Sequence, residues 1–476
     1  MRTALHLSDR TLIALLLLLN GGLKLCWLGV NELTIDEPFT VHWSQQPLSE
    51  VWAMLRTENN PPLFFLLIKV WSAFVPFEPA WLRMPSALFS ALTVWPLFLL
   101  ANRLSGRVVA LTAALIFTFT NYHYGFAHEV RAYSLFTLLA TMGMWLLVRG
   151  KDKPDNGIRA MLGISALNVL LVYTHFFGSL AIGVQFLCVL LLPELRHLRR
   201  NFLIGMGLTA ACYLPYATIF LNRLANSVSQ GTWVEPPVLE ELYNMLWRWS
   251  NAPVLVIAFL LFIVIGAWRS KVAAPGMRPA LLWAFVPLLG MFAVSFFVPM
   301  FLDRYLVHAA PGFALLVAVC IGSASREARV SIGLSALAIL GMLFTFTPWK
   351  DNGRHPSRVW RQWEAWGGPA QGRTWVLPHW YALTLVASSD LDALKGDQAY
   401  ATDLLARINI FAIEDQAQEA DLPDSTAAQV MVIDAGAALV DPERRWYRRL
   451  EASHPRVDSV EADHRVWVYR FRRSGE

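Results

Sequence analysis

Charged residues and cysteines are both scarce in this chain of 476 residues. Asp, Glu, Lys and Arg together make up 16% of it, against about 25% in soluble domains, and 55% of its residues are hydrophobic. All the cysteines fall inside long apolar runs. We therefore expect buried, unreactive thiols, and neither a disulfide framework nor a cysteine-based zinc site. The cysteines are Cys26, Cys188, Cys212 and Cys320.

Nucleotide-binding signatures are absent from the sequence. It contains no glycine-rich phosphate loop, Walker motif or His-x-x-x-His pair. We therefore expect neither nucleotide-driven transport nor a nucleotide-sugar donor. The net charge of +5 is better read loop by loop, as a signal of membrane topology, than as evidence for nucleic acid as a partner.

Long apolar runs are what the sequence has in abundance. They are about 17–22 residues long, enough to cross roughly 30 Å of hydrocarbon. We predict an all-α polytopic membrane protein with about eleven transmembrane helices, with twelve or thirteen left open. The first run lacks a cleavage site after it, which favours an uncleaved span over a signal peptide. The predicted spans lie near residues 11–28, 84–101, 108–123, 131–148, 159–176, 178–193, 202–222, 251–268, 280–299, 304–322 and 329–347.

The loops between these runs alternate in charge. Arginines such as Arg103, Arg199 and Arg269 lie in one set of loops, whereas residues 29–60 and 223–250 are poor in Lys and Arg. Cytoplasmic loops carry an excess of Lys and Arg. The sequence therefore predicts a cytoplasmic N-terminus, an external first loop and an external C-terminus.

Two segments depart from the pattern of spans. Residues 62–77 are apolar, but crossing there would invert every later loop, so we expect this segment to lie along the outer interface or to re-enter. From about Lys350 charged residues become frequent, which predicts a transmembrane domain over 1–349 and a small external α/β domain over 350–476. In that domain we expect strands at Thr374–Leu377, Val430–Ile433 and Arg465–Phe471, and helices at Ser357–Trp366, Tyr400–Phe411 and Pro442–Leu450.

Adjacent carboxylates, Asp36 and Glu37, stand in the first external loop, residues 29–61. With Thr34 before them, they could cap a short helix. They could equally supply a general base at the membrane surface, which typically contributes about 10²–10⁴-fold in rate. Two neighbouring carboxylates also repel each other, which can raise the pKa of one. Both interpretations remain open at this point.

A second external loop holds His128, Glu129, Arg131 and Tyr133 within six residues. An aromatic belt with a snorkelling arginine would account for them. However, an imidazole, a carboxylate and a guanidinium at the edge of a span also indicate a functional site.

Two further polar groups fall on the same side. Asp303, Arg304 and Tyr305 open a late span, either as an anchoring charge pair or with Arg304 holding a phosphate. His175 ends another span, where a structural role is the more common one. Tryptophans of the 223–250 loop could line a sugar or lipid groove, or simply mark the interface.

These residues, in this order, resemble the bacterial members of the protein-mannosyltransferase-like glycosyltransferase superfamily. Those are polytopic GT-C enzymes that use polyprenyl-phosphate sugars, and they include aminoarabinose transferases. The resemblance is dense over residues 30–180, looser in the later spans and slight in the C-terminal region. It lies in Ile35-Asp36-Glu37, Asn60-Pro61-Pro62-Leu63, Leu82–Leu88, Asn102–Arg107, His128–Ser134, Tyr173–Phe176 and Arg304-Tyr305.

The resemblance implies a GT-C fold and transfer of a sugar from a polyprenyl-phosphate donor, at the outer face of the bacterial inner membrane, usually with inversion. The acceptor hydroxyl would belong to a glycan, a lipid or a protein. Asp36 matches the catalytic aspartate, Glu37 its companion, and Arg131 and Arg304 would bind the phosphate. The implied substrate-binding residues are His128, Glu129, Arg131, Tyr133, His175, Arg304 and Tyr305.

The second motif reads His-Glu where the family has two carboxylates, which weakens any inference of a metal ion. We therefore name no cofactor, and a divalent metal stays open. Two alternatives to a transferase remain. A flippase or transporter of a lipid-linked sugar would need functional charges at the bilayer midplane. A non-catalytic membrane partner would tolerate replacement of Asp36.

Overall fold

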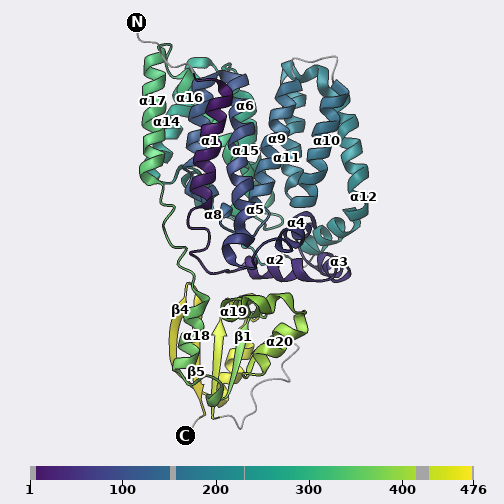
Figure 1. Ribbon diagram of the computed structural model, residues 1–476, viewed down its shortest axis with the longest axis vertical. Coiled ribbons are helices and arrows are strands. Elements are labelled where there is room, and N and C mark those ends of the chain that lie inside the picture. Colours follow the sequence, from purple (N-terminus) through teal and green to yellow (C-terminus); the bar gives the residue numbers. More distant parts are fainter. Residues whose placement is uncertain (1–6, 151–156, 230, 414–427, 474–476) are drawn as a thin grey trace. The chain divides into compact units, whose positions relative to one another are not determined.

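Figure 1 shows the computed structural model of the chain, which describes residues 7–150, 157–229, 231–413 and 428–473. The chain divides into two compact units. The membrane unit comprises Met1–Cys26, Trp52–Phe64 and Arg83–Trp349, and the C-terminal unit comprises Trp27–Val51, Phe65–Leu82 and Lys350–Glu476. Residues 1–6, 151–156, 230, 414–427 and 474–476 of the two predicted domains lie outside the described residues. The C-terminal unit thus joins the last part of the chain to two segments from near its start.

The membrane unit is a bundle of helices (Figure 1). Short helices α8 and α13 and the 3-10 helices η3 and η4 connect the longer ones. The bundle contains α1 (Asp9–Leu25), α6 (Val94–Ser105), α7 (Arg107–Thr118), α8 (Asn121–Ala127), α9 (Tyr133–Arg149), α10 (Gly157–Thr174), α11 (Gly178–Leu191), η3 (Pro193–Leu198), α12 (Arg199–Ser229), α13 (Glu240–Ser250), α14 (Pro253–Ser270), α15 (Met277–Val294), η4 (Asp303–Ala309), α16 (Ala310–Ser323) and α17 (Ala328–Thr345).

Length and composition of the described helices confirm a multi-pass membrane protein. Six are long and apolar enough to cross a bilayer, and shorter apolar helices stand at four more of the predicted spans. The helix α1 covers most of the first predicted span but ends three residues before its expected end at Leu28. The six are Pro79–Ser105, Pro193–Ser229, Pro253–Ser270, Met277–Val294, Asp303–Ser323 and Ala328–Thr345.

The core of the bundle forms around α16. Every residue from Ala310 to Ile321 is buried, because α7, α14 and α15 pack around this helix. The approach of α14 is close at Gly266, where a Cβ atom would lie 2.6 Å from the carbonyl oxygen of Cys320. A side chain at this position would push the two helices apart.

Two sequence-based predictions about the bundle need correction. Cys188 and Cys320 are buried as expected, but Cys26 and Cys212 are exposed on the protein surface. Residues 223–250 are less loop-like than predicted, since α12 continues to Ser229 and α13 occupies Glu240–Ser250. These predictions failed because an apolar or aromatic residue at a membrane interface looks the same in a buried helix, a lipid-facing helix and a loop.

Three helices contribute residues to both units: α3 (Leu48–Thr57), α4 (Leu63–Ser72) and α5 (Pro79–Leu92). The α4 helix covers much of the apolar segment 62–77. Its 10 residues are about 15 Å long, half the thickness of the hydrocarbon core, so it is too short to cross by itself. Lys69 of this helix donates to the carbonyl oxygens of Gln45 and Gln46, at 3.2 and 2.7 Å, and so caps the end of α2 (Asp36–Gln45).

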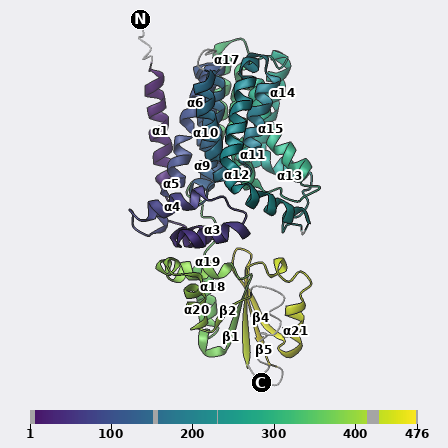
Figure 2. The ribbon, with the colours of Figure 1, turned by 90° about the vertical axis from the view of Figure 1, so that its right-hand side faces the viewer.

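The C-terminal unit contains a five-stranded sheet of order β2-β1-β3-β5-β4. The first three of these strands are parallel, and β5 is antiparallel to β3 and β4. Helices α18, α19 and α20 cover one face and α21 the other (Figure 2). The elements are α18 (Pro356–Ala365), β1 (Arg373–Leu377), α19 (Tyr381–Ser389), η6 (Leu391–Lys395), α20 (Gln398–Ala406), β2 (Ile410–Ala412), β3 (Gln429–Asp434), α21 (Arg445–Ser453), β4 (Arg456–Asp463) and β5 (Val466–Arg472).

The predicted mixed α/β character of this region is confirmed, but two of the predicted helices have different bounds and three elements were missed. The helix predicted at Pro442–Leu450 runs from Arg445 to Ser453. The helix predicted at Tyr400–Phe411 ends at Ala406, and the strand β2 begins at Ile410. The sequence did not reveal α19, β2 or β4. The strand β4 is hard to recognise because it forms an edge of the sheet and is mostly polar and exposed.

Candidate functional site

Five of the predicted substrate-binding residues come together in the membrane unit. Their rings are close: His175 lies 5.9 Å from Tyr133 and 5.4 Å from Tyr305 between centroids. The Arg131 guanidinium carbon lies 5.7 Å from the Tyr133 ring centroid, and that of Arg304 lies 5.8 Å from the Tyr305 centroid. We call Arg131, Tyr133, His175, Arg304 and Tyr305 the arginine–aromatic cluster.

The cluster forms where several elements begin or end. Arg131 precedes α9, Tyr133 is the first residue of α9, and His175 directly follows α10. Arg304 and Tyr305 belong to η4, which packs against α9. Residues far apart in sequence therefore meet at helix ends, where a bundle offers polar groups without breaking its apolar core.

His175 is a neutral member of this cluster. Its Nδ1 atom accepts a hydrogen bond from the backbone N–H of Phe177 at 3.2 Å, which assigns the ring proton to Nε2. The imidazole can therefore donate a hydrogen bond from Nε2 while the two arginines supply the positive charge.

Several residues of this site were not predicted. Phe136 stacks on His175 with centroids 4.8 Å apart, and Phe177 packs on Tyr305 at 4.6 Å. Both looked like ordinary apolar residues of a span. The Asn60 side chain accepts a hydrogen bond from Arg131 at 3.1 Å.

Trp233 lies 5.8 Å from the Arg304 guanidinium carbon. It belongs to the loop whose tryptophans could line a groove or simply mark the interface, and here it extends the cluster. Asn60 had a comparable signal, since the motif Asn60-Pro61-Pro62-Leu63 was among those that carried the resemblance.

The other two predicted substrate-binding residues, His128 and Glu129, behave differently. The His128 Nε2 atom lies 3.0 Å from the carbonyl oxygen of Lys24, and its ring packs on Tyr124 at 4.3 Å. Burial, followed by the charges of Lys24 and Arg83, lowers the pKa of His128 to about 3. Glu129 accepts a hydrogen bond from the backbone N–H of Arg131 through its own carbonyl oxygen, at 2.8 Å. The described contacts thus link His128 to α1 and α8 rather than to the ring cluster.

Asp303 has a partner other than its neighbour. Its carboxylate lies 3.3 Å from the Arg248 guanidinium and accepts the Arg304 backbone N–H at 2.7 Å. Its carbonyl oxygen accepts a hydrogen bond from the Tyr122 hydroxyl. The anchoring ion pair considered from the sequence therefore joins Asp303 to α13.

The adjacent carboxylates lie in the C-terminal unit, at the start of α2. Glu37 is buried, and its Oε2 atom accepts the Thr34 backbone N–H at 3.2 Å, while its own N–H donates to the Thr34 carbonyl at 3.1 Å. A cap is therefore present, with the Glu37 carboxylate as the acceptor instead of the Thr34 hydroxyl. The Asp36 side chain is half-buried.

Ile35, directly before Asp36, has strained backbone geometry. Its φ and ψ angles are 56° and −112°, and its apolar side chain cannot cap the helix. Positive φ is a genuine outlier for a β-branched residue, and such strain costs about 1–3 kcal/mol. Strained residues cluster at functional sites, so this outlier singles out the segment that carries Asp36.

The potential metal ligands are dispersed. Across the parts of the chain that the structure describes, no three or more His, Cys, Asp or Glu side chains are grouped in a way that could hold a metal ion.

Comparison with solved structures identifies the fold. The apo structure of ArnT from Cupriavidus metallidurans aligns with a TM-score of 0.59 at 13% identity, covering 96% of this chain and 97% of that one. The same protein bound to undecaprenyl phosphate gives 0.60 at 14%, covering 97% and 98%. The oligosaccharyltransferase AglB from Archaeoglobus fulgidus, in complex with an inhibitory peptide and a dolichol-phosphate, gives 0.51 at 10%, covering 89% and 69%.

The fold is therefore GT-C-like, with an ArnT-like arrangement of many spans and a C-terminal mixed sheet, and this confirms the predicted fold class. Residues 60–199 match the family model described as the protein O-mannosyl-transferase TMEM260 N-terminal domain. No curated protein sequence matches the chain.

Proposed function

We propose that this protein is an integral-membrane glycosyltransferase that moves a sugar from a polyprenyl-phosphate donor to an acceptor hydroxyl, with inversion. The observation that carries the proposal is the similarity over 97% of the chain to ArnT bound to undecaprenyl phosphate. The match of residues 60–199 to an O-mannosyl-transferase model supports the same class of reaction. On this proposal the N-terminus is cytoplasmic, and the chemistry takes place at the outer face of a bacterial inner membrane.

The arginine–aromatic cluster suits the phosphate of the donor. A prenyl phosphate leaves as an anion, so its departure needs positive charge at its oxygens rather than a strong acid. Arg131 and Arg304 would supply that charge, because a guanidinium can hold two phosphate oxygens at once. The neutral His175 would add a hydrogen bond, and Tyr133 and Tyr305 would offer rings and hydroxyls to the donor.

Asp36 would take the proton from the acceptor hydroxyl. An inverting transfer needs one base on the face of the sugar opposite the leaving group. Asp36 is the first residue of α2, where the partial positive charge of a helix N-terminus interacts favourably with a carboxylate. Glu37 would hold the start of the helix, and His128 and Glu129 would contribute to a donor- or acceptor-binding element.

The test is transfer from a panel of polyprenyl-phosphate sugars in detergent, comparing the native chain with Asp36→Asn. We expect the rate to fall by at least about 10²-fold while donor binding is retained. Glu50→Gln is a matched control, because Glu50 is an exposed carboxylate in the nearby helix α3.

Two outcomes would contradict the proposal. If transfer survives in Asp36→Asn, the base assignment is wrong and Glu37 or Glu129 takes its place. If no donor is consumed, but labelled lipid-linked sugar crosses a vesicle bilayer, the protein is a flippase and the transferase is abandoned.

A further inference from the structure

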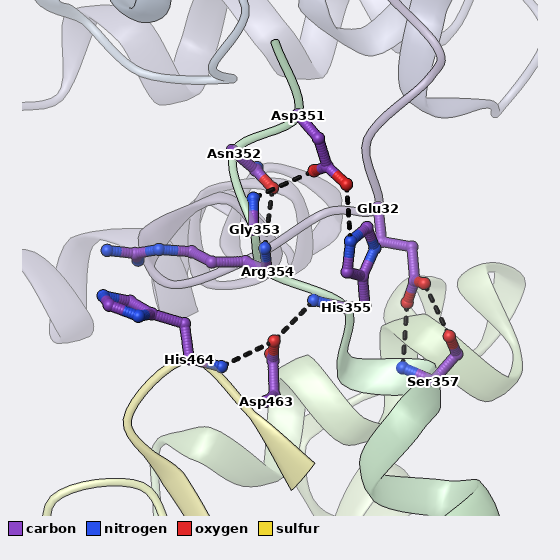
Figure 3. Close-up of polar contacts among 9 residues, drawn as sticks. All are labelled: Glu32, Asp351, Asn352, Gly353, Arg354, His355, Ser357, Asp463 and His464. Carbon is purple, nitrogen blue, oxygen red and sulfur yellow. Dashed lines mark hydrogen bonds and ion pairs between the residues drawn. The ribbon is translucent and has the colours of Figure 1, made fainter. Parts of the chain in front are cut away.

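The segment before Asp36 is hydrogen-bonded to the C-terminal region. The two carboxylate oxygens of Glu32 accept from the Ser357 hydroxyl at 2.6 Å and from its backbone N–H at 3.0 Å (Figure 3). Ser357 is the second residue of α18, where backbone N–H groups lack partners within the helix. Glu32 therefore caps a helix that lies 325 positions further along the chain.

The part of the chain that carries Ser357 is itself held in place. The Asp463 carboxylate accepts the backbone N–H groups of His355 and His464 at 2.7 and 2.8 Å, which links this segment to the end of β4. The Asp351 carboxylate lies 2.7 Å from the His355 Nε2 atom. Figure 3 shows these groups around the same turn that leads into α18. Glu32 is thus attached to a fixed point of the α/β domain.

The helix α2 makes a second attachment further along. His42, fully buried, places its Nδ1 atom 3.2 Å from the Leu394 carbonyl oxygen, and Gln46 donates to the Gly396 carbonyl at 2.8 Å. Both carbonyls belong to the turn formed by η6, and α2 also packs against α19. The chain from Glu32 to Gln46 is therefore fastened to the C-terminal region on both sides of Asp36.

The strain at Ile35 fits this arrangement. A strained backbone persists only where the surrounding structure over-determines it. Here Glu32 is fixed three residues before Ile35, and the Thr34–Glu37 hydrogen bonds and the two contacts of α2 fix the chain after it. Releasing one of these anchors would let Ile35 return to an ordinary conformation, and Asp36 would move with it.

We propose that the α/β domain is a scaffold that positions Asp36, and that Glu32 is the positioning residue through which the domain fixes the segment before Asp36. The reaction that Asp36 performs rests on the proposed function, but the placement of residues 33–46 does not. The scaffold role differs from acceptor recognition, in which the domain would contact the acceptor and leave this segment unchanged.

The experiment measures hydrogen–deuterium exchange of peptides covering residues 33–46 in the full-length chain, beside transfer kinetics. In Glu32→Ala we expect exchange to rise by at least about 10-fold, because hydrogen bonds to a carboxylate are lost. The kcat value should fall by a similar factor, with KM for the donor unchanged. Glu32→Gln, which keeps one acceptor oxygen, and Ser357→Ala, which keeps the backbone donor, should both give smaller effects.

A matched control removes a cap of the same kind elsewhere in the domain. Asp441 accepts the backbone N–H groups of Arg445 and Trp446, at 2.7 and 2.9 Å, at the start of α21. Asp441→Ala should leave both exchange over 33–46 and kcat unchanged. If it changes them as much as Glu32→Ala does, the effect is general destabilisation and the specific role of Glu32 is wrong.

The remaining outcomes separate this inference from the proposed function. Unchanged exchange over 33–46 in Glu32→Ala overturns the scaffold, whatever happens to transfer. Faster exchange in Glu32→Ala, together with full activity of Asp36→Asn, supports the scaffold but shows that Asp36 is not the base. A raised KM for the acceptor in Glu32→Ala, with unchanged exchange, would point to acceptor recognition instead.

Discussion

Two groups of candidate residues, one in each unit, are built in opposite ways. The arginine–aromatic cluster of the membrane unit consists of cations and stacked rings at helix ends. The Glu32–Glu37 segment of the C-terminal unit consists of carboxylates held by backbone hydrogen bonds around a strained residue, Ile35. One group is an assembly of cations and rings packed together, and the other is a segment held under constraint.

On the proposed function, this difference corresponds to a division of labour. An anionic leaving group is served by fixed positive charge, which needs no movement during the reaction. A base must meet an incoming hydroxyl at the correct distance, and small displacements of a reacting group lower the rate steeply. Substitutions in the arginine–aromatic cluster should therefore alter donor affinity, and substitutions in the 32–37 segment should alter kcat.

The largest expected contrast lies within the carboxylate pair. Asp36→Asn should lower kcat by about 10²–10⁴-fold, because it removes the base. Glu37→Gln should lower kcat only about 5-fold, which corresponds to the loss of a helix cap worth about 1 kcal/mol. Single-turnover rates with saturating donor measure both. Equal losses from the two variants would show that the pair acts as a unit and that a base and a cap cannot be assigned to them separately.

The next effect concerns the donor. Arg131→Gln and Arg304→Gln should each weaken binding of undecaprenyl phosphate by about 10–100-fold, the value of a hydrogen bond to a charged group. Arg248→Gln is the control, because this arginine is committed to Asp303 at 3.3 Å. Binding can be followed by ligand-induced thermal stabilisation in detergent. If Arg248→Gln loses as much affinity as the other two variants, overall positive charge rather than these two arginines governs donor binding.

The sequence predicted much of the arginine–aromatic cluster because polar residues are conspicuous at the ends of apolar runs. Arg131, His175 and Arg304 stand out for that reason, because ionisable residues at the edges of spans are functional candidates. Phe136 and Phe177 could not be separated from the core in the same way. An aromatic residue that stacks on a histidine has the same local pattern as one that faces lipid.

The constraint on the carboxylate segment was beyond sequence-based prediction. Glu32 is an ordinary acid in a loop, and its partner Ser357 is identified only by tertiary structure. The strain at Ile35 has no sequence signal either, since nothing forbids isoleucine there except the conformation it adopts. Local patterns identify which residues are chemically capable, whereas the contacts that fix their positions join distant parts of the chain.

A smaller effect tests the neutral state of His128, which lies between two predicted spans. Its pKa is lowered from about 6.5 in the unfolded chain to about 3 in the fold, so the unfolded state binds the extra proton first as the pH falls. This contribution to stability is complete above pH 6.5 and is lost progressively between pH 6.5 and 3. In His128→Phe, the unfolding temperature measured from pH 7 to 4 should decline less than in the native chain. An equal decline in both would show that His128 does not set the slope.

The smallest expected effect is the most specific to the strained segment. Ile35→Gly removes the steric cost of positive φ, worth about 1–3 kcal/mol, but adds the entropy cost of glycine, about 0.5–1 kcal/mol. The free energy of unfolding should therefore rise slightly or stay level, where truncating an unstrained half-exposed isoleucine would lower it. The kcat value should nevertheless fall, because glycine also permits conformations in which Asp36 is displaced. Ile35→Val, which keeps the β-branch and the strain, should retain kcat. If Ile35→Gly is destabilised and Ile35→Val is not, side-chain packing rather than backbone strain governs this position, and the contrast between the two regions is weaker than the φ angle indicates.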